Sequence, residues 1–135
     1  MKTVVLEYCT DGFNLKREKI KSFNFLKERL EEIKNEADSV INGIFSVDIV
    51  IEETGRIAVA LSDKCILMYT SHDLEITFIS LGDESAQGLT TYYFGDYSDT
   101  SNKYIITYDV ALDVLKEWVH HGVISDLIKW TTNLY

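Results

Sequence analysis

The sequence has 135 residues, of which 46% are hydrophobic and 26% charged, and its net charge is −9. Such a composition argues against a disordered chain, and the length suits one domain, residues 1–135, whose core needs no metal or disulfide. With a pI near 4.7, the chain lacks the basic patch that nucleic-acid binding requires. No apolar run approaches the ~20 residues of a membrane span or forms a signal peptide, so we expect a cytoplasmic protein.

The first part of the chain predicts a strand followed by an amphipathic helix. Apolar side chains alternate with mixed ones over residues 2–10, as in a strand with one buried face. A turn at Asp11-Gly12 then leads into residues 14–21, which we interpret as a polar, basic connection. From Phe23 onward, apolar residues recur every three or four positions with charged residues between them. This spacing predicts a helix, and Ser22 can cap its start.

Four short strands in succession are predicted in the middle of the chain. Side chains alternate over residues 45–52 and again over 57–61, and Glu53-Thr54-Gly55 supplies the turn of a hairpin. Residues 65–70 contain an unbroken apolar run, which is typical of a central strand covered on both faces. Alternation returns over residues 74–79. Strands joined by short turns predict an antiparallel meander.

The next stretch alternates between predicted loops and strands. Residues 82–88 are polar and acidic and predict a loop, whereas residues 89–94 are rich in threonine and tyrosine and predict a strand. We expect residues 95–102 to form an exposed acidic loop. Alternation over residues 104–108 predicts a last short strand.

A second helix is predicted near the C-terminus. Thr107 or Asp109 can cap its start, and Gly122 ends it at a position where a left-handed residue is wanted. Residues 128–130 predict an extended tail that docks back onto the sheet or the helix. This order of elements lacks the alternation of strand and helix that builds a parallel sheet. It predicts an α+β fold in which two main helices pack on an antiparallel meander.

Nearly all of the net charge falls in one segment. Residues 44–102 contain ten acids and two bases and therefore carry −8, whereas the segments on either side are close to neutral. Like charges crowded together repel one another and cost stability, so their concentration suggests a use. The simplest use is attraction of a cationic partner. The alternative is an acidic surface that only keeps the protein soluble.

A search for catalytic and metal motifs is negative. The sequence contains no phosphate-binding glycine loop, nucleophile elbow, zinc-protease helix, calcium loop or paired CxxC. His72 beside Asp73 offers a base with an orienting carboxylate, but adjacent side chains usually point apart. Asp83 and Glu84 fit a solvated loop better than a cation site. We therefore predict no catalytic residue, no cofactor and no metal, and hence a protein that is not an enzyme.

The histidines and cysteines also have structural interpretations. His120 and His121 fall in the last turn of the predicted second helix, where partial positive charge is favourable, so a capping role is preferred to a metal site. Cys9 and Cys65 each lie in an apolar strand pattern without a neighbouring ligand. Both are predicted to be buried, reduced thiols rather than a disulfide or a nucleophile.

Aromatic residues accompany the acids in the second half of the acidic segment. Aromatic side chains are the usual anchors of protein interfaces, and surrounding acids steer a basic partner into place. Part of this aromatic set must instead face the core, because neighbouring strand residues point to opposite sides of a sheet. The predicted partner-binding residues are Tyr69, Asp73, Asp83, Glu84, Tyr93, Asp96, Tyr97 and Asp99.

The last third of the chain resembles immunity proteins of bacterial polymorphic toxin systems, the Imm-type family that includes contact-dependent growth inhibition immunity proteins. The similarity is carried by Tyr93-Phe94-Gly95, by Tyr104-Ile105-Ile106 leading into the helix that begins Tyr108-Asp109-Val110, by Gly122, and by Ile128-Lys129-Trp130. Many family members have proline near these positions, whereas this chain has none.

The resemblance implies a protein without enzymatic activity that binds one toxin domain, commonly a nuclease or deaminase, and blocks its active site or substrate surface. An acidic sheet with aromatic anchors is complementary to the basic cleft that such a toxin needs. The alternative is an acidic regulatory protein that binds another basic partner through the same surface. Neither interpretation involves nucleic acid or a membrane as the partner, and neither fixes the oligomeric state.

Overall fold

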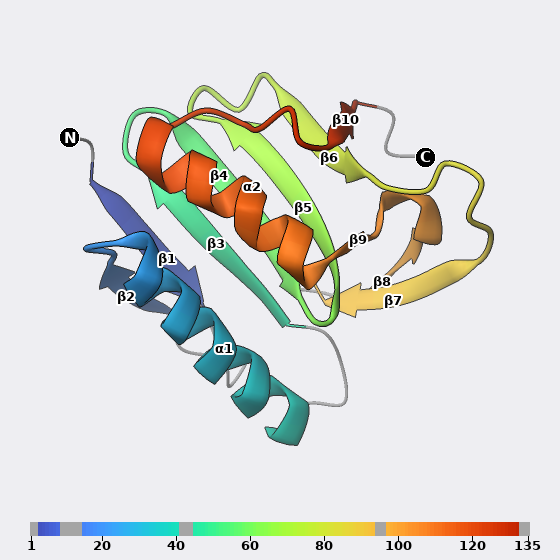
Figure 1. The fold of residues 1–135 in the computed structure, drawn as a ribbon, viewed down its shortest axis with the longest axis horizontal. Helices are drawn as coiled ribbons and strands as arrows, with labels where there is room; N and C mark the ends of the chain where they lie inside the picture. The colour runs from blue at the N-terminus through green and yellow to red at the C-terminus, as the bar shows by residue number, and fades with distance from the viewer. Residues whose placement is uncertain (1–2, 9–14, 41–44, 94–96, 133–135) are drawn as a thin grey trace.

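The computed structural model describes residues 3–8, 15–40, 45–93 and 97–132, and within them an antiparallel sheet is covered on one face by two helices (Figure 1). The order of its strands is β10-β6-β5-β4-β3-β1-β2, and β9 pairs with β5. Strands β7 and β8 form a separate two-stranded sheet. The elements are β1 (Val4–Tyr8), β2 (Lys16–Lys19), α1 (Phe23–Val40), β3 (Phe45–Ile51), β4 (Gly55–Leu61), β5 (Lys64–Ser71), β6 (Thr77–Leu81), β7 (Leu89–Tyr93), β8 (Tyr97–Ser101), η1 (Asn102–Tyr104), β9 (Ile106–Thr107), α2 (Tyr108–His121) and β10 (Lys129–Thr131). This arrangement confirms the predicted α+β class and the meander.

The alternating strands bury one row of side chains under the helices. Leu6, Ile49 and Ile57 are register partners on β1, β3 and β4, and all three are fully buried. Because side chains alternate between the faces of a sheet, the residues between them point to the opposite face. One face of the strands thus forms the main core, and the other is left for surface contacts.

Both predicted helix caps are present. The Ser22 hydroxyl oxygen accepts a hydrogen bond from the Phe25 N–H (3.1 Å) at the start of α1, and the Thr107 hydroxyl oxygen accepts one from Val110 (3.3 Å) at the start of α2. Gly122 ends α2 with a left-handed φ of 67°, and its N–H donates to the Trp118 carbonyl oxygen (2.8 Å). These bonds satisfy backbone groups that a helix end leaves without partners.

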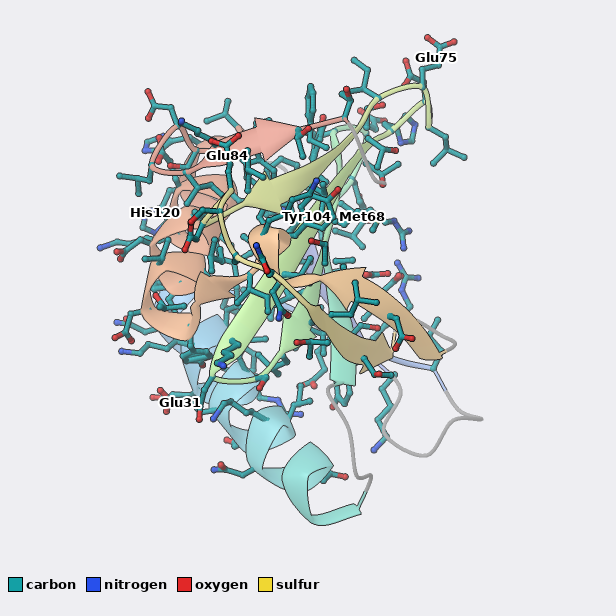
Figure 2. All side chains as sticks on the ribbon, turned by 90° about the vertical axis from the view of Figure 1, so that its right-hand side faces the viewer. Glu31, Met68, Glu75, Glu84, Tyr104 and His120 are labelled. Carbon is teal, nitrogen blue, oxygen red and sulfur yellow. The ribbon has the colours of Figure 1, made fainter. Side chains whose placement is uncertain are left out.

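A smaller core lies on the opposite face of the sheet. Ala60, Ile66 and Ile79 pack there under Tyr104 of η1. The buried Ser80 hydroxyl joins the sheet to η1, because it accepts a hydrogen bond from the Leu67 N–H (3.0 Å) and donates one to the Tyr104 carbonyl oxygen (2.8 Å). Figure 2 shows the helices on one side of the sheet and the β7–β8 hairpin on the other. The hairpin and η1 cover only one end of this second face.

Two segments that were expected to be loops are strands. The basic connection at residues 14–21 contains β2, which pairs with β1, and the acidic loop at residues 95–102 contains β8, which pairs with β7. Neither strand has apolar alternation, so their formation depends on a neighbour's backbone and on side-chain hydrogen bonds such as that from Thr91 to Asp99 (2.7 Å). Both loop predictions are wrong at these residues.

The last part of the chain follows the prediction with shorter strands. The strand expected at residues 74–79 begins only at Thr77, and the strand expected at 104–108 is reduced to β9 after η1. The C-terminal tail does return to the sheet, as predicted, because β10 pairs with β6. Trp130 fixes the tail by donating its indole N–H to the Ser125 carbonyl oxygen (2.7 Å).

Candidate partner-binding surface

The open part of the sheet carries a row of ion pairs that balance one another. Arg56 on β4 lies 2.9 Å from Asp48 on β3 and 3.4 Å from Glu7 on β1, and Glu7 in turn lies 2.8 Å from Arg17 on β2. Alternation places these charges on the face opposite the helices. Burial raises the pKa of Asp48, while the Arg56 guanidinium opposes that rise. Acids and bases therefore largely cancel across this part of the sheet.

Two further acids of the segment 44–102 have basic partners from outside it. Lys34 on α1 lies 2.8 Å from Asp63 and lowers the pKa of that carboxyl group. Lys129 on β10 lies 3.5 Å from Glu84. Folding therefore neutralises part of the charge that is crowded in the sequence. Of the other described acids, Asp73 and Glu75 precede β6 and Asp83 follows it.

The first acidic end is the β6–β7 loop with the β7–β8 hairpin. The Asp83 carboxylate accepts hydrogen bonds from the Ser85 N–H (2.9 Å) and hydroxyl (2.6 Å), which lower the pKa of Asp83. Glu84 follows it, and Asp99 lies on β8. A pocket of about 470 Å³ lies at this end, and Asp83 is the one acid that lines it, together with Lys64, Ala86, Thr90, Ile105, Ile106 and Val110 among others. This end therefore offers one carboxylate, that of Asp83, at a partly apolar pocket.

The second acidic end is formed by the turns β3–β4 and β5–β6. The Asp73 carboxylate accepts hydrogen bonds from the Ser71 hydroxyl (2.6 Å) and the Glu75 N–H (3.0 Å), which lower the pKa of Asp73. The His72 N–H donates to the Thr54 carbonyl oxygen (3.1 Å) and thereby joins the two turns. A groove of about 490 Å³ lies between them.

The predicted partner-binding residues do not gather in one patch. Asp73 precedes β6 and Asp83 follows it, so they lie at opposite ends of that strand (Figure 1). Their neighbours Glu75 and Glu84 are likewise far apart in Figure 2. Tyr93 and Tyr97 are backbone register partners at the closed end of the hairpin. Asp96 lies outside the described residues. Of the set, Asp83 and Glu84 follow β6 and Asp99 lies on β8, whereas Tyr93 and Tyr97 occupy the other end of the hairpin.

Tyr69 lies on the helix side of the sheet. Its ring stacks on Phe78 at 6.1 Å between centroids and meets Trp118 edge to face at 5.7 Å. These contacts place Tyr69 against the main core, on the face opposite η1 and the hairpin. Its position matches the expectation that some of the aromatic set must pack inward.

The second acidic end contains residues that the sequence analysis did not select. Glu52 and Glu53 occupy the β3–β4 turn, and Leu74 and Glu75 occupy the β5–β6 turn, all of them exposed. The sequence could have predicted that these two turns lie together, because every second turn of an antiparallel meander falls at the same end of the sheet. Pairing these two turns would have found the groove.

His72, Asp73 and Cys65, which could in principle carry out chemistry, are each surrounded by groups of the fold. The Asp73 carboxylate is held by Ser71 and Glu75, and His72 is exposed beside it. Burial raises the pKa of the Cys65 thiol, which donates to the Ser62 carbonyl oxygen (3.0 Å). Cys9 lies outside the described residues. Among the described residues, no cluster of three or more histidine, cysteine or acidic side chains is arranged to hold a metal ion.

The chain matches a known protein family. A family model described as "Immunity protein Imm1" matches residues 28–132, which run from the first turns of α1 past β10. No curated protein matches the sequence. Within the described part of the chain, neither helix has the length and apolarity needed to cross a membrane.

Proposed function

The chain belongs to the Imm1 family of immunity proteins, and from this membership we propose that it neutralises a cognate toxin domain by forming a stoichiometric complex with it. The family match over residues 28–132 is the observation that carries the proposal. The toxin in this proposal is a nuclease or deaminase that acts in the cytoplasm. The immunity protein inhibits it without chemistry of its own, by covering its active site or substrate surface.

Electrostatics supports a basic toxin surface as the target. A domain that acts on nucleic acid needs lysine and arginine side chains where the phosphates bind. The immunity protein carries −9 overall, and the carboxylates of Asp83 and Asp99 are exposed at the β6–β8 end. Hydrogen bonds from Ser85 lower the pKa of Asp83, so this carboxyl group stays ionised at neutral pH. Opposite potentials raise the rate of encounter and discourage wrong partners.

We propose the β6–β8 end as part of the interface. Its contact residues are Asp83, Glu84 and Asp99 together with the hairpin positions Tyr93, Asp96 and Tyr97, while Asp73 contributes from the other end of β6. Tyr69 is not among these contacts, because its ring packs against Trp118 of α2 on the other face of the sheet. A complex of this kind needs to bury roughly 1,200–2,000 Å² in total. That area exceeds one loop, so neighbouring parts of the open face must take part.

The test is binding to the toxin domain that is encoded next to the immunity gene. A catalytically inactive form of that domain is co-expressed with the tagged immunity protein and purified at physiological salt. We expect the two proteins to elute as a stoichiometric complex, and we expect the immunity protein to restore growth of cells that express the active toxin. Recovery of the immunity protein alone, without rescue of growth, contradicts the proposal. A basic partner unrelated to any toxin gene would favour the regulatory alternative.

A further inference from the structure

The groove at the second acidic end is built from two rows of register partners and two turns. Val50, Arg56 and Thr70 form one row across β3, β4 and β5 on the open face, and Ile51, Gly55 and Ser71 form the next. The turns close the groove of about 490 Å³ at its end, and the bond from His72 to Thr54 holds them together. The groove is therefore a fixed feature of the sheet rather than a gap between independent loops.

An apolar side chain stands exposed beside the groove. Leu74 is 74% exposed, and its backbone has a left-handed φ of 65°. Its N–H donates to the Ser71 carbonyl oxygen (2.9 Å), and the Ser71 hydroxyl bonds both Asp73 (2.6 Å) and the Ile76 N–H (3.1 Å). These bonds thus fix the backbone that carries the exposed leucine. An ordered apolar group loses little further freedom when a partner covers it.

Among the residues that line the groove, Arg56 is the only lysine or arginine and is already paired, and His72 also lines it. The Arg56 guanidinium is turned toward Asp48 (2.9 Å) and Glu7 (3.4 Å) on the open face. By contrast, no ion pair within the described residues involves Glu52, Glu53 or Glu75. Hydrogen bonds from Ser71 and Glu75 keep the Asp73 carboxylate ionised, since they lower its pKa. Glu52 and Glu53 line the groove, and Asp73 and Glu75 stand beside it in the β5–β6 turn. Within the described residues, these four rim acids form no ion pair with a lysine or arginine.

We infer that this groove receives a lysine or arginine side chain of the toxin domain, with the aliphatic stem against Leu74 and the cationic head among the rim acids. The inference rests on the proposed function, because the toxin domain is the occupant. Long cationic side chains bury their stems on apolar surface while their heads keep polar partners. A groove that offers the apolar side chains of Val50 and Leu74 next to unpaired carboxylates fits that shape and charge. It also places a second point of contact at the end of the sheet opposite the β6–β7 loop.

Charge reversal with a matched control tests the cationic part. Binding of the inactive toxin domain is measured by calorimetry for the double variant Glu52→Lys, Glu75→Lys and for the control Glu28→Lys, Asp113→Lys, whose exposed positions lie on α1 and α2. Both variants change the net charge by the same amount. We expect Kd to rise at least about 30-fold for the groove variant, since like charges at an interface cost several kcal/mol, and less than about 3-fold for the control. Equal Kd values in the two variants overturn the inference.

A second pair of variants tests the apolar part. Asparagine tolerates a left-handed backbone, so Leu74→Asn removes the side chain without breaking the turn. Leu127→Asn is the control, because Leu127 is also exposed (62%) and lies far along the chain between α2 and β10. We expect about a 10-fold rise in Kd for Leu74→Asn and little change for the control. A loss of binding confined to Leu74→Asn, with charge reversal harmless, means an apolar occupant and overturns the inference.

These outcomes separate the groove from the function as a whole. If the wild-type protein binds the toxin domain and both groove variants bind equally well, the function stands and the groove inference is wrong. If the wild-type protein forms no complex, the proposed function fails first. Circular dichroism melts of each variant establish that a change in Kd comes from the surface and not from unfolding.

Discussion

Trp118 on α2 donates its indole N–H to the main-chain oxygen of Ile49 on β3, 3.1 Å away. This bond ties the second helix to the middle of the sheet, and the indole ring is almost fully buried. Truncation to alanine removes both the bond and a large packed volume. We expect Trp118→Ala to lower the free energy of unfolding by about 3–5 kcal/mol in urea titrations. Trp130→Ala, at a partly exposed position, should cost about half as much, and an equal loss would contradict the difference in burial.

Ser80 provides a second test of the structure, on the opposite face of the sheet. Its hydroxyl bridges the Leu67 N–H and the Tyr104 carbonyl oxygen inside the smaller core. Ser80→Ala leaves both backbone groups without that partner, so we expect stability to fall by about 1–3 kcal/mol. Hydrogen exchange should speed up in η1 more than in α1. Unchanged exchange in η1 would show that the bridge does not hold it.

Gly82 and Gly122 should respond differently to alanine. A Cβ atom at position 82 would overlap the Ile105 carbonyl oxygen, which is backbone and cannot move aside easily, whereas a Cβ at position 122 meets nothing. Gly122→Ala costs only the strain of its left-handed φ, about 1 kcal/mol, and Gly122→Asn should recover part of it. We expect Gly82→Ala to lower the melting temperature by more than Gly122→Ala does. The reverse order would contradict the close approach at position 82.

The pair of Arg29 and Glu18 makes stability depend on pH. The Arg29 guanidinium bonds Glu18 through Nε (3.1 Å) and Nη2 (2.8 Å), and these bonds, with one from the Tyr8 hydroxyl (2.7 Å), lower the pKa of Glu18 below 4.5. A lowered pKa in the folded state means that the carboxylate stabilises the fold above the unfolded pKa. The contribution disappears as pH falls through the folded pKa.

Glu18→Gln isolates this effect, because glutamine resembles the protonated acid. We expect wild type to be about 1 kcal/mol more stable than the variant at pH 7, given that both side chains of the pair are partly exposed. The gap should close progressively below pH 4.5. Urea titrations between pH 3 and pH 7 measure it, and a gap that stays constant over this range would exclude the proposed role of Glu18.

The β6–β8 end gives the prediction that bears on the proposed function. Reversing Asp83, Glu84 and Asp99 to lysine should lower the association rate with the inactive toxin domain by at least about tenfold at low salt. The dependence of that rate on ionic strength should also flatten, because fewer opposite charges remain to be screened. Stopped-flow mixing over a salt series measures both quantities. A variant that keeps the wild-type salt dependence would place the steering charges elsewhere.

The main sheet could be predicted from sequence because its strands have one buried face. Ile49 and Ile57 each follow a charged residue, Asp48 and Arg56, in an alternating strand. Ser22, Thr107 and Gly122 mark helix ends through well-understood backbone chemistry. Strands β2 and β8 could not be found in this way. Their side chains are polar on both faces, so what makes them strands is a partner that comes from elsewhere in the chain.

The candidate surface was harder to predict than the fold for a related reason. The sequence shows which segment is acidic, but it does not show that Lys34 and Lys129 return to neutralise Asp63 and Glu84. Nor does spacing along the chain reveal that Asp73 and Asp83 are separated by the length of β6. Charge is a property of residues, whereas a charged surface is a property of their arrangement.

The position of the acidic turns has a consequence for how such a protein can change its partner. Glu52, Leu74, Asp83 and Glu84 all lie in connections between strands, outside the buried rows that contain Ile49 and Ile57. Under the proposed function, substitutions in those connections would alter the size, charge and shape of the recognised toxin surface while the interior keeps its composition. Recognition of a new toxin and stability of the fold would then depend on different residues.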